Sequence, residues 1–143
     1  MAFTAAVPVA VDSPLPVAEA RALLAARLGA HAALRGQVAG SLVEVRRVHP
    51  RPNRRSPALR ARLEPRPEGG SRVVGTVAPD FGMLLPAVVA FVAFVFGMRA
   101  KIPILTLLGL VGGFVSWRAF RRSARVEADA IAKELGALLQ PRR

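Results

Sequence analysis

Two long apolar runs near the middle of the chain constrain its fold more than any other feature. They cover Phe81–Met98 and Ile102–Trp117, and a short turn containing Arg99 and Lys101 separates them. At about 1.5 Å per residue, a helix over the first run would span roughly 27 Å, close to the ~30 Å hydrocarbon core of a bilayer. We therefore predict a transmembrane helical hairpin over residues 81–117.

The charged residues lie on either side of this apolar segment. The 143-residue chain has a net charge of +12 and a mean hydropathy of +0.37, an unusual combination for a soluble protein. Lys and Arg outnumber Asp and Glu by 12 to 6 over residues 1–80, by 2 to 0 over residues 81–117 and by 7 to 3 over residues 118–143. The hairpin and a composition rich in arginine, alanine and leucine predict a two-pass bacterial inner-membrane protein, and the positive-inside rule places both of its termini in the cytoplasm. Residues 1–16 do not have the pattern of a signal peptide, so the hairpin itself is expected to direct insertion.

Before the hairpin, the sequence predicts an α+β module over residues 13–80, preceded by a flexible arm at residues 1–12. An amphipathic helix is expected over Pro14–Leu28, with Ser13 as its N-cap. From Leu34 the apolar period changes to two, which indicates the strands of a four-stranded antiparallel meander. The predicted strands are Leu34–Ala39, Leu42–Val48, Ala58–Glu64 and Arg72–Ala78.

The third predicted strand alternates most clearly. Arg60 and Arg62 point to one face, and Leu59, Ala61 and Leu63 point to the other. This pattern predicts a sheet with one packed face and one wet face, and we expect the first helix to cover the packed face.

Small residues in both apolar runs predict how the two membrane helices pack. Ala90, Ala93 and Gly97 share one face of the first helix, while Gly109 and Gly113 form a GxxxG element on the second. Small residues allow close approach of helix backbones where no hydrophobic effect drives association. We expect this packing within one chain rather than between two chains.

Two basic segments are candidate binding surfaces. The second membrane helix is expected to continue as a basic cytoplasmic helix over residues 118–143 that packs on the sheet. It begins with Arg118, Arg121, Arg122 and Arg125. The loop His49–Ser56 carries Arg51, Arg54 and Arg55 among prolines. Both segments could bind anionic head groups or an acidic protein face, although basic cytoplasmic loops are common in membrane proteins and this simpler interpretation is preferred for the loop. Nucleic acid is disfavoured because no stacking aromatic accompanies the loop.

The sequence contains no recognisable catalytic or metal-binding pattern. It has no cysteine, and its two histidines, His31 and His49, lack the spacing of metal ligands. We expect both histidines to be solvent-facing or loop residues, and Glu127 and Asp129 to form solvated ion pairs. Nucleophile elbows, phosphate-binding loops and paired acids at helical spacing are all missing from the sequence. It therefore predicts neither an enzyme, nor a cofactor, nor a metal site.

Several predicted strand and turn segments resemble those of a known group of proteins. The segments Leu34–Val38, Pro57–Glu64 and Gly69–Gly75, followed by two apolar runs, resemble a group of small bacterial membrane proteins that have no assigned activity. The chain departs from their pattern at Ala61 and Ser71. The resemblance implies an N-terminal antiparallel β module followed by a two-helix transmembrane hairpin, and it implies no chemistry.

These observations leave three functional hypotheses. The first is a binding, scaffold or accessory subunit that acts through the basic module, with the lipid bilayer and other membrane-protein subunits as partners. The second is an oligomeric transport or permeation component, which is disfavoured because neither apolar run contains an ionisable residue. The third is a membrane-tethered binder of anionic lipid or nucleic acid, which would use the basic loop.

Overall fold

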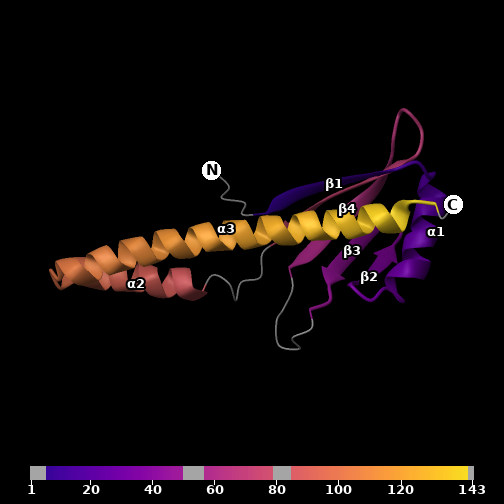
Figure 1. Ribbon diagram of the computed structural model, residues 1–143. Helices are drawn as coiled ribbons and strands as arrows, with labels where there is room; N and C mark the ends of the chain where they lie inside the picture. The colour runs from indigo at the N-terminus through magenta and orange to yellow at the C-terminus, as the bar shows by residue number, and fades with distance from the viewer. Residues whose placement is uncertain (1–5, 50–56, 79–84, 142–143) are drawn as a thin grey trace. The chain divides into compact units, whose positions relative to one another are not determined.

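The computed structural model describes residues 6–49, 57–78 and 85–141 (Figure 1). The chain divides into two compact units. We call them the sheet unit, Met1–Ala78 with Ala124–Arg143, and the helix unit, Pro79–Ser123. The described residues form one five-stranded antiparallel sheet and three helices, which confirms the predicted α+β class.

The secondary structure begins with a strand rather than with the predicted helix. In chain order the elements are β1 (Val7–Ser13), α1 (Val17–Leu28), β2 (Leu34–Ala39), β3 (Leu42–Arg47), β4 (Ala58–Pro65), β5 (Ser71–Ala78), α2 (Leu85–Arg99) and α3 (Pro103–Leu139). The strand order in the sheet is β1-β5-β4-β3-β2, and all neighbouring strands are antiparallel. The four predicted strands are therefore present as a meander, with ends close to those predicted.

The fifth strand, β1, corrects the prediction of a flexible arm over residues 7–12; residues 1–5 of the predicted arm lie outside the described residues. It pairs with β5 along its whole length at the edge of the sheet. Val9 and Val11 are buried at alternate positions, as expected for a strand with one face on the core. Pro8 interrupts this apolar pattern in the sequence, but an edge strand tolerates proline because one side of its backbone has no ladder partner.

The helix α1 begins at Val17, later than the predicted Pro14. Ser13 is not its N-cap, because Ser13 is the last residue of β1 and pairs with Ser71 of β5. Its buried hydroxyl instead accepts a hydrogen bond from the backbone N–H of Leu15 at 3.2 Å. The serine therefore stabilises the turn between β1 and α1.

One face of the sheet is covered by α1 and by the C-terminal part of α3, which crosses the sheet in Figure 1. The core is built from alternate strand residues together with helix residues. The strand residues are Val9, Val11, Leu34, Val43, Val45, Leu59, Ala61, Leu63, Val73 and Val77; the helix residues are Ala20, Leu24, Leu28, Ala128, Ile131, Leu135, Leu138 and Leu139. In addition, Nη1 of Arg27 on α1 donates a hydrogen bond to the carbonyl oxygen of Leu138 at 2.7 Å. The two helices are thus part of one core with the sheet.

In the helix unit, α2 and the first part of α3 are joined by a short turn. Lys101 has φ 55°, and the N–H of Ile102 donates to the carbonyl oxygen of Gly97 at 2.9 Å. A residue in the left-handed region with such a bond is a common end for a helix. The turn therefore allows the chain to reverse between the two helices.

The predicted transmembrane hairpin is matched in part. Among the described residues, α3 is the one helix with the length and apolar composition to cross a membrane, and α2 is apolar but has 15 residues. The predicted first run began at Phe81, which lies outside the described residues. The second run, Ile102–Trp117, coincides with the first part of the 37-residue helix α3.

Candidate functional site

Large apolar side chains cover the outside of the helix unit. On α2 the exposed ones are Leu85, Val88, Val89, Phe91, Val92, Val95, Phe96 and Met98; on α3 they are Ile104, Leu107, Leu108, Leu110, Val111, Phe114 and Val115. Water-soluble surfaces seldom contain an apolar area of this extent, because its hydration is unfavourable. This surface therefore requires an apolar solvent or an apolar partner.

The inward side of the same helices is made of small residues. A Cβ atom added to Gly109 of α3 would lie 2.7 Å from Cα of Phe94 and 2.8 Å from the carbonyl oxygen of Ala90, both on α2. A Cβ atom added to Gly97 would lie 2.6 Å from the backbone nitrogen of Thr106. The structure thus places three of the predicted packing residues, Ala90, Gly97 and Gly109, where the two backbones approach each other.

The other two predicted packing residues have more room. A Cβ atom added to Gly113 would lie 3.9 Å from Cβ of Ala90, which is ordinary van der Waals contact. Ala93 is half-buried on α2. The neighbouring Gly112 is also close to Ala90, with a distance of 3.5 Å for an added Cβ. Close approach is therefore concentrated at Gly97 and Gly109.

Four predicted anion-binding arginines follow the apolar part of α3. Arg118, Arg121, Arg122 and Arg125 are all exposed, and their spacing places them on one side of the helix. Just before them, the rings of Trp117 and Phe120 stack with their centroids 5.8 Å apart. The guanidinium of Arg121 lies 5.8 Å from the centroid of the Trp117 ring, within cation–π range. An aromatic residue followed by arginines is typical of the boundary between a membrane and water.

The other predicted basic site, Arg51, Arg54 and Arg55, lies outside the described residues. His49, which precedes it, lies in a loop as expected, but its side chain is largely buried. Its Nε2 is 2.9 Å from Oε1 of Glu127 on α3, and the two side chains are 17% and 10% exposed. The expectation that Glu127 forms a solvated ion pair was wrong, because α3 packs this part of its surface against the sheet.

Arg47, at the end of β3, lies beside the same carboxylate. Its Nη1 is 3.8 Å from Oε2 of Glu127, and Oε2 accepts no hydrogen bond from the described residues. The cluster of Arg47, His49 and Glu127 therefore ties the end of β3 to α3. It contains no nucleophile, and its pattern is that of a structural contact.

The second histidine also has a local structural role. Nδ1 of His31 accepts hydrogen bonds from the N–H groups of Ala33 and Leu34, each at 3.2 Å, in the loop between α1 and β2. Its Nε2 is 4.0 Å from Oε2 of Glu134. Within the described parts of the chain, no three His, Asp or Glu side chains are grouped so that they could hold a metal ion.

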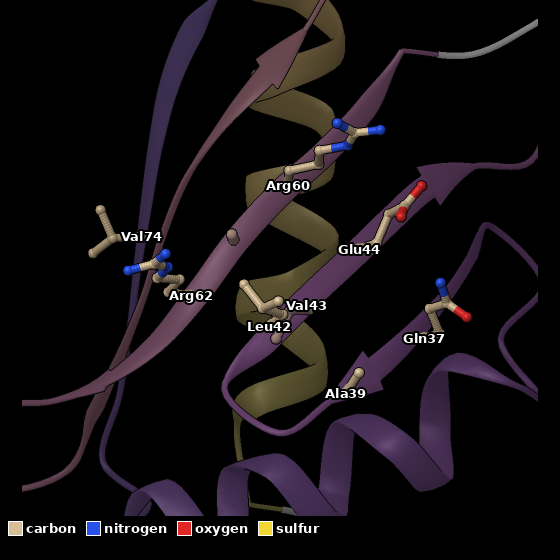
Figure 2. Close-up of a pocket in the computed structure, with 9 residues that line it drawn as sticks. Gln37, Ala39, Leu42, Val43, Glu44, Arg60, Arg62 and Val74 are labelled. Carbon is tan, nitrogen blue, oxygen red and sulfur yellow. The ribbon is translucent and has the colours of Figure 1, made fainter.

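The open face of the sheet contains a shallow pocket of about 500 Å³ (Figure 2). Figure 2 shows this face with α3 behind the sheet. The pocket is lined by Gln37, Ala39, Leu42, Val43, Glu44, Arg60, Ala61, Arg62 and Val74. Leu42 and Val74 are 54% and 38% exposed, although both are apolar. The alternation along β4 predicted that Arg60 and Arg62 face water, but it did not indicate the pocket, which is lined by residues of four neighbouring strands, β2 to β5.

Several other charges of this face are paired with each other. Arg72 of β5 donates hydrogen bonds to both carboxylate oxygens of Asp12 on β1, at 2.5 and 3.2 Å. The hydrogen bond from Arg72 lowers the pKa of the Asp12 carboxyl below its usual range, and the positive charge of Arg66 acts in the same direction. Glu44 is paired with Arg46 at 3.1 Å.

Arg60 and Arg62 differ from these paired residues. Neither has an ion pair or a side-chain hydrogen bond among the described residues, and both are exposed. The open face therefore presents two unpaired guanidinium groups beside exposed apolar side chains.

Comparison of the chain with protein-family models, with curated proteins and with solved structures finds no match. The resemblance to small bacterial membrane proteins therefore stays a prediction.

Proposed function

We propose that the protein is a small integral membrane protein that acts as a binding, scaffold or accessory subunit. In this proposal α2 and the apolar part of α3 form a two-pass anchor, and the basic sheet unit is the part that engages other molecules. The observation that carries the proposal is the outward-facing apolar surface of the helix unit, whose inward contacts are made by glycine and alanine. Lipid accounts for this arrangement, because lipid solvates large apolar side chains while small residues allow the helices to pack.

The sequence of the helix unit supports an anchor rather than a conduit. No ionisable residue occurs between Phe81 and Met98 or between Ile102 and Trp117. Pathways for charged substrates normally contain ionisable residues within the membrane, paired with each other or facing a water-filled cavity. The role of a transport component is therefore the weaker hypothesis.

The anchor is tested by fractionation of membranes from cells that produce the protein. We expect it to stay in the membrane pellet after washing with alkaline carbonate or high salt and to enter the supernatant only with detergent. Release by carbonate or by salt alone would overturn the proposal, because it would show a peripheral protein.

The orientation is tested separately, and the absence of cysteine makes the test direct. Single cysteines are introduced as Ala100→Cys, in the turn between the helices, and Gln140→Cys, after α3. A membrane-impermeant maleimide added to spheroplasts should label the first variant, and it should label the second only after lysis. The reverse labelling pattern would contradict cytoplasmic termini.

A further inference from the structure

We propose that the open face of the sheet docks a segment of another protein that presents a carboxylate beside an apolar side chain. The docking site is the pocket at Arg60, Arg62, Leu42 and Val74. This inference deepens the proposed function, on which it rests, by naming the surface of the binding subunit and the chemistry of its partner.

The register of the sheet places one arginine between two exposed apolar residues. Arg62 pairs with Leu42 of β3 on one side and with Val74 of β5 on the other. Neighbouring strands lie about 4.8 Å apart, so these three side chains form a continuous row across the sheet. A ligand that bridges the row meets apolar surface at both ends and a guanidinium group in the middle.

A second arginine extends this site along β4. Arg60 pairs with Glu44 of β3 in the register, but the ion pair of Glu44 is with Arg46 on its own strand. The guanidinium groups of Arg60 and Arg62 are thus free to bind a carboxylate of another molecule. Arginine donates two parallel hydrogen bonds to such a carboxylate. Exposed arginine beside apolar residues is also a composition that protein interfaces favour.

The positive charge of the chain makes a second copy of the same protein an unfavourable ligand for this pocket. Each copy has a net charge of +12, so two copies would repel each other, and the two arginines of the pocket favour an anionic ligand. Nucleic acid and a bare anionic lipid surface fit poorly as well. None of the five strands contains an aromatic residue for base stacking, and the exposed Leu42 and Val74 beside the arginines offer nothing to a phosphate group. A polypeptide that combines acidic and apolar side chains matches both features of the site.

The proposal is tested by site-specific photo-crosslinking in native membranes. The variant Ala39→p-benzoylphenylalanine places the crosslinker at the margin of the pocket, and irradiation should give an adduct with one protein. The crosslinked peptide of that protein should contain Asp or Glu next to an apolar residue. The double variant Arg60→Glu/Arg62→Glu should reduce the adduct by roughly tenfold or more. Arg60→Gln/Arg62→Gln, which removes the attraction without adding repulsion, should also reduce it.

A matched control keeps the change in net charge constant. Arg21 and Lys133 are exposed in the same unit and away from the pocket, and Arg21→Glu/Lys133→Glu should leave the adduct unchanged. Reversal of charge in the partner, from its crosslinked carboxylate to arginine, should restore the adduct with Arg60→Glu/Arg62→Glu. Pulse proteolysis of the variants confirms that the sheet unit is folded.

Four results would overturn the docking site: no adduct, an adduct with lipid or nucleic acid, an adduct that persists without the two arginines, or an equal loss in the control variant. Fractionation of the same membranes separates this failure from failure of the proposed function. If the protein stays in the carbonate-washed pellet but gives no arginine-dependent adduct, the membrane anchor is supported and the docking site is contradicted. Protein that appears in the carbonate supernatant contradicts the proposed function itself.

Discussion

The two units of this protein arrange apolar side chains in opposite ways. In the sheet unit, leucine, isoleucine and valine fill the space between the sheet and its two helices, and most charged side chains lie outside. In the helix unit, the large apolar side chains lie outside, and glycine and alanine lie between the helices. The proposed function explains this difference by two solvents, water for the sheet unit and lipid for the helix unit, and single substitutions in each unit test that explanation.

The largest effect is expected from a cavity in the core of the sheet unit. Leu135 of α3 is fully buried, and Leu135→Ala should lower the free energy of unfolding by about 2–5 kcal/mol. The measurement is pulse proteolysis of the detergent-solubilised protein in urea. Leu108→Ala, at an exposed position of the helix unit, should leave the stability of the sheet unit unchanged. Equal effects of the two substitutions would contradict the conclusion that large apolar side chains are buried in the sheet unit and exposed in the helix unit.

A new charge should act differently in the two units. Val92 of α2 and Val126 of α3 are almost equally exposed, at 59% and 57%, but Val92 lies in the helix unit and Val126 in the sheet unit. Val92→Asp should cost about 2.5–3.5 kcal/mol of insertion free energy if that surface faces lipid. Val126→Asp should change stability by less than about 0.5 kcal/mol if its surface faces water. The fraction of protein recovered in carbonate-washed membranes measures the first effect, and a tolerated Val92→Asp would contradict a lipid-facing α2.

Helix packing in the helix unit should depend on one glycine more than on its neighbour. Gly109→Ala places a methyl group against the backbone of α2, and we expect it to destabilise the helix pair by about 1–3 kcal/mol. Gly112→Ala is the control, because its added Cβ meets only ordinary contact at 3.5 Å. Disulfide formation between cysteines introduced on α2 and α3 reports whether the pair stays close. If both alanine variants behave alike, the close contact at Gly109 is not what holds the helices.

The buried polar cluster of the sheet unit should contribute a moderate amount to stability. His49→Ala removes the hydrogen-bonding partner of Oε1 of Glu127, and we expect the free energy of unfolding to fall by about 1–3 kcal/mol. A double-mutant cycle with Glu127→Gln measures the coupling between the two side chains. A coupling near zero would show that the contact does not stabilise the fold.

The smallest effect is expected at the exposed pair of Asp12 and Arg72. Because pairing lowers the pKa of Asp12 in the folded state, its stabilisation is present above the unfolded pKa of about 4 and is lost as the pH falls through the folded value. Asp12→Asn should lower the midpoint of thermal unfolding at pH 7 by a few degrees at most, on the order expected for a surface pair. The two proteins should converge at the acid end of a pH series. A difference that grew as the pH fell would have the wrong sign for this mechanism.

The sequence predicted the elements whose patterns are local. Alternation in β4 and the change of apolar period at Leu34 indicated strands whose ends the structure matches closely. It missed β1, because Pro8 interrupts a run that becomes a strand only through pairing with β5, some 60 residues later in the chain. Helix α1 was placed three residues too early for the same reason, since Ser13 belongs to that strand rather than to a cap.

The candidate sites also fall into two groups, those that a local sequence pattern predicts and those that depend on contacts between distant segments. The packing residues Gly97 and Gly109 and the arginines of α3 follow from helical spacing, which a sequence shows directly. The pocket on the open face depends on which strands are neighbours, and no single segment of the sequence contains that information. Glu127 looked like a solvated charge on a helix, and its burial depends on the packing of α3 against the sheet.

The sequence by itself determined the apolar segment, its separation from the charged segments and the period of most strands, because each of these is set by neighbours along the chain. The tertiary structure alone decided the fifth strand, the burial of Glu127 beside His49 and the row of Leu42, Arg62 and Val74. The physical reason is that burial and pairing depend on residues far apart in the chain, which the fold brings into contact.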